Sequence, residues 1–364
     1  MKFDLILDDL LSIPKALLNC LRYYLSEDGR NKLEEIKRYI QESKIKRIIF
    51  IGHAYNYFAS IIPLRYLNSH YFSRMEELQG STEITCIIYE IDEFNSYYNP
   101  FKNLEETIFI FITSSGNSNQ IRKGLKKLLD ANVDPQRIWG ISDYEESYLG
   151  MKAHYFLPLK FGTEKIMGTK SYVNAILLFY FVCRSVMNKE AIPSNREEDI
   201  RQLIFEIKFY NQDWESHTKN LTDFLGEKLD NLFFISKGAS LSSAYQASLN
   251  FKAITQTFCV ALSMGVFQHG PIRIVDESFR GVLIIGDETS MKESTNLIEE
   301  ITNNRGGKLI LLNNSRKISS IGSSNNNIFV FEHTTENINI APIFEIIVLQ
   351  YLFLQIAKTR GLMR

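Results

Sequence analysis

The feature that most constrains the fold is a series of short, continuously apolar runs separated by segments with helical periodicity. Two of these runs are Arg47–Gly52 (RIIFIG) and residues 107–113 (TIFIFIT). They are rich in β-branched and aromatic side chains, which is typical of parallel strands that helices cover on both faces. Residues 118–131 place apolar side chains on one helical face and basic ones on the other. This alternation predicts an α/β fold with a doubly wound parallel sheet.

The alternation runs through two halves of the chain. In the first half we predict strands at 47–52, 84–89, 107–113, 137–141 and 155–157, and helices at 55–70, 118–131 and 164–187. A polar stretch with a proline, residues 188–195, then marks a domain boundary. In the second half we predict strands at 231–236, 258–260, 281–286, 308–313 and 327–331, and helices at 241–254 and 343–358. The predicted organisation is a helical segment at 1–45, a first domain at 46–190, a second domain at 191–340 and a closing helix at 341–364.

Composition and charge argue against several classes of protein. The net charge of −1 disfavours nucleic-acid binding, which usually needs a basic excess. The apolar helical run at residues 172–183 is shorter than the roughly 20 residues of a membrane span. Acidic side chains interrupt the apolar N-terminal stretch, so it does not resemble a signal peptide. Four widely spaced cysteines without a CxxC pair are typical of reduced, buried thiols. We expect a soluble, cytoplasmic protein with no membrane or nucleic-acid partner.

A cluster of hydroxyl side chains follows the apolar run that ends at residue 112. Residues 113–118, which we name the phosphate loop, read TSSGNS and lead into a predicted helix. Exposed backbone N–H groups and the positive end of the helix dipole would attract an anion there, and hydroxyls add donors. Gly116 lets a ligand approach the backbone. The four hydroxyls belong to Thr113, Ser114, Ser115 and Ser118. The alternative is a hydroxyl-rich helix N-cap that binds nothing.

Two further segments are predicted at the carboxyl ends of the strands, where open α/β sheets bind ligands. They are Gly52-His53-Ala54 and residues 162–171 (GTEKIMGTKS). Neither half has GxGxxG after its first strand, and the chain has no GxxxxGK[ST], so dinucleotide and nucleoside triphosphate sites are disfavoured. A hydroxyl loop without a lysine or a metal-binding partner suits a monophosphate. We therefore expect no cofactor and no metal.

In order and spacing, these motifs resemble those of the sugar isomerase (SIS) domain family. The resemblance rests on IFIFITSSGNSNQIRKGL, FGTEKIMGTKSYVNAILL and VFQHGPI, and it covers nearly the whole chain from about residue 46. It is strongest to members with two SIS domains, namely the isomerase half of glucosamine-6-phosphate synthase and the ketosamine-phosphate deglycases. The resemblance implies two flavodoxin-like subdomains with flanking N- and C-terminal helices.

The resemblance also implies roles for individual residues. The phosphate loop would hold a phosphosugar, and Gly52, His53 and residues 164–170, including Thr169 and Lys170, would line the sugar. His269 of the HGP motif would assist ring opening, often across a dimer interface. A homodimer or higher homo-oligomer is therefore implied.

One catalytic group that the resemblance leads us to expect is missing. In the isomerases a glutamate sixteen residues before the HGP histidine moves a proton between C1 and C2. Counting back from His269 reaches Ala253, which cannot carry a proton. The lysine of the synthase, three residues earlier, falls on Asn250. A base from elsewhere would have to replace the glutamate if the chain is an enzyme.

Three polar residues have both catalytic and structural alternatives. His53 could act as a substitute base, because the pKa of imidazole lies near neutrality, or it could hydrogen-bond the sugar or the backbone. Glu164 could be catalytic, or it could stabilise the start of the helix predicted at 164–187. Lys170 could pair with a carboxylate or approach the ligand.

The second half has no comparable loop, because Asp287 and Glu288 after its strand at 281–286 would repel a phosphate. We expect one site per chain.

Two functions remain open. The first is an enzyme that isomerises, deaminates or deglycates an amino-sugar or ketosamine phosphate by proton transfer next to a carbonyl. The second is a catalytically degenerate phosphosugar sensor or regulatory protein. We favour the enzyme, because the HGP motif is kept.

Overall fold

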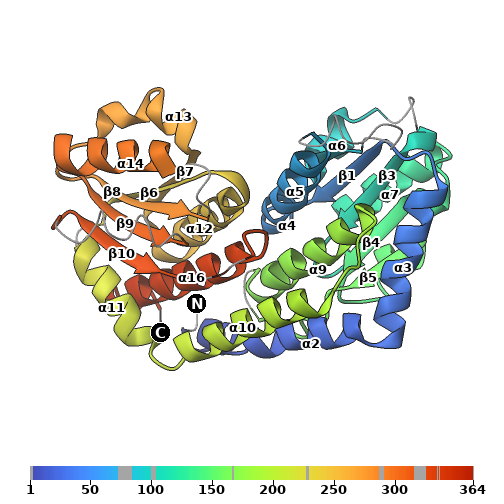
Figure 1. Ribbon diagram of the computed structural model, residues 1–364, viewed down its shortest axis with the longest axis horizontal. Helices are drawn as coiled ribbons and strands as arrows, with labels where there is room; N and C mark the ends of the chain where they lie inside the picture. Colours follow the sequence, from blue (N-terminus) through green and yellow to red (C-terminus); the bar gives the residue numbers. More distant parts are fainter. Residues whose placement is uncertain are drawn as a thin grey trace. The chain divides into compact units, whose positions relative to one another are not determined.

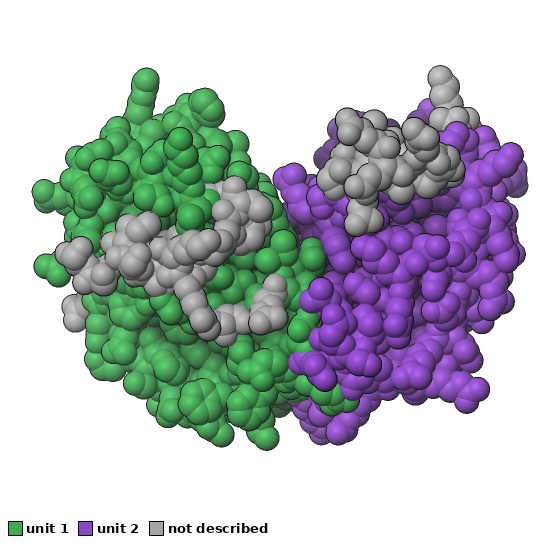
Figure 2. Space-filling model, viewed as in Figure 1, with its two compact units in different colours: residues 1–14, 165–167, 199–364 green, residues 15–164, 168–198 purple. Residues whose placement is uncertain are grey.

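The computed structural model describes residues 3–72, 84–99, 104–165, 168–226, 229–286, 291–314, 325–333, 335 and 337–363. The chain divides into two compact units (Figures 1 and 2). Unit 1 comprises residues 1–14, 165–167 and 199–364, and unit 2 comprises residues 15–164 and 168–198. Each unit is built around its own parallel sheet, which confirms the predicted fold class.

Unit 2 contains the first sheet. Its strands are β1 (Arg47–Gly52), β2 (Thr85–Glu90), β3 (Thr107–Ile112), β4 (Ile138–Ser142) and β5 (Tyr155–Pro158). They pair in parallel in the order β2-β1-β3-β4-β5. The helices that lie wholly or mainly in unit 2 are α2 (Ile13–Leu25), α3 (Glu27–Glu42), α4 (Tyr55–Ala59), α5 (Ile61–Phe72), α6 (Ile91–Tyr97), α7 (Asn119–Asp130), α8 (Tyr148–Lys152) and α9 (Lys170–Val186).

Helices cover both faces of this sheet, which explains the continuously apolar strands. Because successive side chains of a strand point to opposite faces, Ile49 and Ile51 of β1 pack in one core cluster with side chains of α6, α7 and α8. Phe50 of the same strand packs edge-on against Phe179 of α9, with ring centroids 5.2 Å apart. Helix α9 also contacts α3 and α5. Both sets of alternating side chains are therefore buried, and the strand needs apolar residues throughout.

Two of the predicted helices in this unit differ from the observed ones. The helix expected at 55–70 is interrupted at Ser60, because Pro63 has no N–H to donate and its ring would clash with the carbonyl of Ala59 in a continuous helix. The helix expected at 164–187 begins only at Lys170. Glu164 therefore does not start a helix, and residues 161–165 have no regular secondary structure.

Unit 1 repeats the topology of unit 2. Its strands are β6 (Asn231–Ser236), β7 (Phe258–Ser263), β8 (Arg280–Ile285), β9 (Lys308–Asn313) and β10 (Ile328–Glu332), paired in parallel in the order β10-β9-β8-β6-β7. The helices assigned wholly or mainly to unit 1 are α1 (Phe3–Leu11), α10 (Ser194–Tyr210), α11 (Trp214–Leu225), α12 (Leu241–Thr255), α13 (Met264–Gln268), α14 (Met291–Glu299) and α16 (Ala341–Thr359). Numbered from the first strand of each unit, both sheets have the order 2-1-3-4-5.

Helix α16 lies in the core of unit 1. It packs against α12, α11 and α1, and Phe353 meets Phe251 of α12 edge-on. Among the described residues it is the one helix long and apolar enough to cross a membrane, but 89% of that apolar window is buried inside the fold. Its apolar character is therefore accounted for by core packing.

Candidate functional site

The site lies in unit 2, where the order of the strands reverses. From β1 the chain moves to β2 on one side, whereas β3, β4 and β5 lie on the other side of β1. In such sheets the loops after the two central strands diverge and leave a crevice that binds ligands. The loop after β1 begins with His53, and the loop after β3 is the phosphate loop, residues 113–118.

The four hydroxyls of the phosphate loop all accept hydrogen bonds from the protein. Ser118 Oγ accepts from the Ile121 N–H at 3.3 Å, as the N-cap of α7. The other three acceptors are Thr113 Oγ1 from Gly116 N–H at 3.4 Å, Ser115 Oγ from Asn117 N–H at 3.4 Å, and Ser114 Oγ from the Tyr55 hydroxyl at 3.0 Å. Within the described residues none of these hydroxyls donates to a protein acceptor. Their protons are therefore free to bind an anion.

Backbone donors in the loop are free as well. In the described part of the chain, the N–H groups of Ser114, Ser115 and Ser118 have no protein acceptor. The left-handed backbone at Gly116, with φ of +69°, shapes the turn. A Cβ at this glycine would lie 2.1 Å from Ser147 Oγ, so both the conformation and the space require glycine. N–H groups and hydroxyls therefore gather at the N-terminus of the twelve-residue helix α7, where the helix dipole favours an anion.

Neighbouring segments fix the loop from outside. Ser142 Oγ donates to the Ser114 carbonyl at 3.0 Å, and Leu149 N–H donates to the Gly116 carbonyl at 3.0 Å. Asn117 Oδ1 accepts from Tyr148 N–H at 2.9 Å. These bonds use acceptor oxygens of the loop and leave the N–H groups of Ser114, Ser115 and Ser118 without a protein acceptor in the described part of the chain. The loop conformation is therefore fixed by contacts with the rest of unit 2.

Tyr55 links the phosphate loop to the segment that precedes α9. Its hydroxyl donates to Ser114, and a Cβ at Gly168 would lie only 2.5 Å from its ring. Burial raises the pKa of the Tyr55 phenol, so this group stays protonated and remains a donor. Tyr55 was not among the predicted site residues, and its position three residues after the first predicted strand was the available signal.

Glu164 caps the N-terminus of α9 from a loop position. Its Oε1 accepts from Thr169 N–H at 2.7 Å, from the Thr169 hydroxyl at 2.9 Å and from Ser171 N–H at 3.0 Å. Its Oε2 accepts from the Ser171 hydroxyl at 2.7 Å. The carboxylate therefore stabilises the start of the helix, which is the structural role considered for it above. It does so from the loop before α9 and not from the first turn of the helix. Both oxygens already accept hydrogen bonds.

Thr169 and Lys170 are both buried next to this cap. The Thr169 hydroxyl donates to Glu164, and the Lys170 ammonium donates to the Thr163 carbonyl. Residues 166 and 167 of the predicted sugar-lining segment lie outside the described residues.

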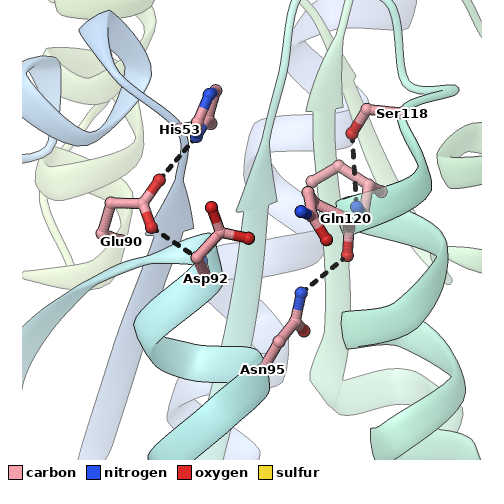
Figure 3. Close-up of polar contacts among 7 residues, drawn as sticks. His53, Glu90, Asp92, Asn95, Ser118 and Gln120 are labelled. Atoms are coloured by element: carbon pink, nitrogen blue, oxygen red, sulfur yellow. Dashed lines mark hydrogen bonds and ion pairs between the residues drawn. The ribbon is translucent and has the colours of Figure 1, made fainter.

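His53 lies beside two carboxylates (Figure 3). The parallel register of β1 and β2 pairs Gly52 with Glu90, so the residue after Gly52 reaches the Glu90 side chain. His53 Nδ1 is 2.6 Å from Glu90 Oε1, and Glu90 Oε2 accepts from Asp92 N–H at 2.7 Å. Ligand atoms of His53, Glu90 and Asp92 all lie within 4.8 Å of one another, close enough for one cation to reach all three. Glu90 could not be predicted from local sequence, because its contact with His53 spans 37 residues. The absence of a metal stays a prediction.

The remaining predicted residues lie in unit 1. His269 is exposed and is the C-cap residue of α13. Ala253 is exposed on α12, and the buried Asn250 side chain accepts from Gln246 Nε2 at 3.0 Å. Asp287 and Glu288, expected to repel a phosphate, lie outside the described residues.

The chain matches no protein-family model. Among curated proteins it is similar to the glutamine–fructose-6-phosphate aminotransferase (isomerizing) of Sulfolobus acidocaldarius, with 24% identity over 308 residues that cover 84% of this chain and 47% of that protein. Similarity to the protein of the same name from Bartonella quintana is 20% over 357 residues, or 96% of this chain and 55% of that protein. The chain spans about half the length of the curated relatives it matches.

Solved structures show the same fold. The C-terminal domain of glucosamine-fructose-6-phosphate aminotransferase from Francisella tularensis superposes with a TM-score of 0.76 at 19% identity, covering 98% of this chain and 96% of that one. Tagatose-6-phosphate ketose/aldose isomerase from Escherichia coli gives 0.73 at 15% identity, with 97% and 92% covered. The resemblance found in the sequence is confirmed at this level: the chain has the double sugar isomerase domain fold.

Proposed function

We propose that the chain binds a sugar phosphate at the crevice between β1 and β3 of unit 2. The observation that carries the proposal is the hydrogen-bonding state of the phosphate loop. Four hydroxyls accept from the protein and keep their protons free, and three N–H groups beside them lack a protein acceptor in the described part of the chain. A loop with this many free donors and no carboxylate suits an anion such as a phosphate better than a neutral hydroxyl.

The chemistry we propose is proton transfer next to a carbonyl. The names of the similar proteins include an isomerizing aminotransferase of fructose 6-phosphate, a tagatose-6-phosphate ketose/aldose isomerase and a glucosamine-6-phosphate deaminase. All three names refer to phosphorylated sugars, which supports a sugar phosphate as ligand, and one of them is an amino sugar. The substrate we propose is an amino-sugar or ketosamine phosphate. We propose that His269 assists ring opening and that the protein works in the cytoplasm as a homodimer or larger homo-oligomer.

A second function is favoured by one residue. Ala253 stands where the resemblance places the proton-transferring glutamate, and its methyl group cannot take up a proton. A chain that keeps the phosphate loop and lacks a base would be a phosphosugar sensor or regulatory protein. The two functions share the same ligand and differ only in whether the bound sugar exchanges a proton.

A thermal-shift panel tests the shared part of both functions. Fructose 6-phosphate, glucosamine 6-phosphate and a ketosamine 6-phosphate should raise the melting temperature, while the same sugars without phosphate should not. Absence of any phosphate-dependent shift would refute both functions. Exchange of the C1 or C2 hydrogen with solvent deuterium, or release of ammonia, would then identify the enzyme; binding without either would identify the sensor.

A further inference from the structure

We infer that His53 is the catalytic base of the proposed reaction and that Glu90 is its positioning residue. This inference rests on the proposed function, because it assigns the proton acceptor that Ala253 cannot supply. The observation behind it is the pair of side chains in Figure 3, in which His53 Nδ1 lies 2.6 Å from Glu90 Oε1. In the neutral imidazole, an Nδ1–H that donates to the carboxylate leaves Nε2 as the proton acceptor.

The Glu90 carboxylate is held in place independently of His53. It is the N-cap residue of α6, and its Oε2 accepts from the Asp92 N–H at 2.7 Å. Only Oε1 is directed to the imidazole. A contact between two mobile surface side chains would contribute little, since the ordering of both offsets the attraction. Here one partner is already ordered by the helix, and the Glu90 side chain is only 27% exposed.

The backbone directly after His53 is strained. The next residue, Ala54, has φ of 48° and ψ of −117°, a conformation that a residue with a Cβ adopts only under strain. Such strain needs compensation from the surrounding structure. The strained residue directly follows His53, whose side chain is 65% exposed and therefore accessible to a ligand.

The pair lies next to the phosphate loop along the sheet edge. β1 and β3 are paired neighbours, and Gly52 is in register with Ile112, the last residue of β3. Helix α6 is fixed to the same loop region, because Asn95 Nδ2 donates to the Gln120 carbonyl in the first turn of α7 at 3.1 Å. The carbonyl of a ketose 6-phosphate lies at the far end of its carbon chain from the phosphate. A base one strand away from the phosphate loop is therefore suitably placed for it.

The proposed step balances without a metal or a redox partner. His53 Nε2 takes the proton from the carbon next to the carbonyl, and the electrons of that C–H bond form the C=C bond of an enediolate. The carbonyl oxygen takes the negative charge and then the proton of the adjacent C1 hydroxyl. The imidazolium returns its proton to the former carbonyl carbon, and the deprotonated C1 oxygen becomes the new carbonyl. The Glu90 carboxylate beside Nδ1 orients the imidazole and stabilises the imidazolium.

The test compares Glu90→Gln with the matched variant Glu93→Gln. Glu93 is an exposed carboxylate in the same first turn of α6 and lies outside the three-residue cluster. The reaction followed is the exchange of a C1 hydrogen of fructose 6-phosphate with solvent deuterium. We expect Glu90→Gln to lower kcat by roughly 10²-fold with KM within about two-fold, and His53→Gln to abolish exchange. Glu93→Gln should match the wild type.

The outcomes separate this inference from the proposed function. Phosphate-dependent thermal stabilisation should survive in Glu90→Gln and His53→Gln, because neither residue belongs to the phosphate loop. If the wild type binds fructose 6-phosphate but exchanges no hydrogen, or if Glu90→Gln and Glu93→Gln behave alike, the pair has no catalytic role and the binding function stands. If fructose 6-phosphate and the other sugar phosphates do not bind at all, the proposed function fails and the inference fails with it.

Discussion

Replacing Glu164 distinguishes a structural carboxylate from a catalytic one. In Glu164→Ala, the N–H groups of Thr169 and Ser171 lose their acceptor at 2.7 and 3.0 Å. Because a hydrogen bond to a charged group contributes about 1.5–3 kcal/mol and water replaces part of the loss, we expect the free energy of unfolding to fall by about 3 kcal/mol. In Glu164→Gln one acceptor oxygen remains, and the expected loss is about 1–2 kcal/mol.

Thermal unfolding measures this loss directly. About 1 kcal/mol corresponds to a change in melting temperature of roughly 2–4 °C for a domain of 150–250 residues, so Glu164→Ala should melt about 6–12 °C lower. The exposed Glu146 in the same unit provides the control, and Glu146→Gln should change stability by less than about 0.5 kcal/mol. The structural role of Glu164 is refuted if Glu164→Gln keeps the wild-type melting temperature but exchanges the hydrogen of the bound sugar phosphate with solvent at least about 10²-fold more slowly, as expected for a missing base.

Three further variants test the loop and the core. Gly116→Ala should weaken fructose 6-phosphate binding by at least about ten-fold in calorimetric titration, because the residue has φ of +69° and its Cβ would meet Ser147; unchanged affinity would refute the loop geometry. Ser118→Asp should keep the N-cap of α7 and a melting temperature within a few degrees, but its carboxylate should abolish phosphate binding. Burial lowers the pKa of His333 to about 3, so the free energy of unfolding should fall between pH 6.5 and 3, because only the unfolded imidazole takes up a proton there. The expected loss at pH 5 is about 2 kcal/mol, and in His333→Leu urea unfolding should show a smaller dependence on pH over this range.

The sheets could be predicted from the sequence because their signal is local. Every position of β3 is buried, so its six residues are apolar or β-branched and stand out as TIFIFI. The phosphate loop was visible for the same reason, since its hydroxyls and glycine are consecutive. The helix predicted at 164–187 began too early because Glu164 is a common residue at helix starts, whereas the cap it forms acts on residues 169–171 across a loop.

The contacts between distant segments could not be predicted from local patterns. His53 meets Glu90 because the register of β1 and β2 places Gly52 beside Glu90, and no pattern near either residue reveals that register. Tyr55 meets Ser114 across 59 residues for the same kind of reason. A parallel strand pair joins residues through a long crossover, so knowing the fold class leaves the register still to be determined.

Amide chemical-shift mapping with fructose 6-phosphate tests the central claim most directly. If the phosphate is bound by residues 113–118, the largest shifts should fall on the N–H groups of Ser114, Ser115 and Ser118, and inorganic phosphate should shift the same three. Fructose should leave them unchanged. Equal effects of fructose and fructose 6-phosphate, or shifts confined to other segments, would contradict the account.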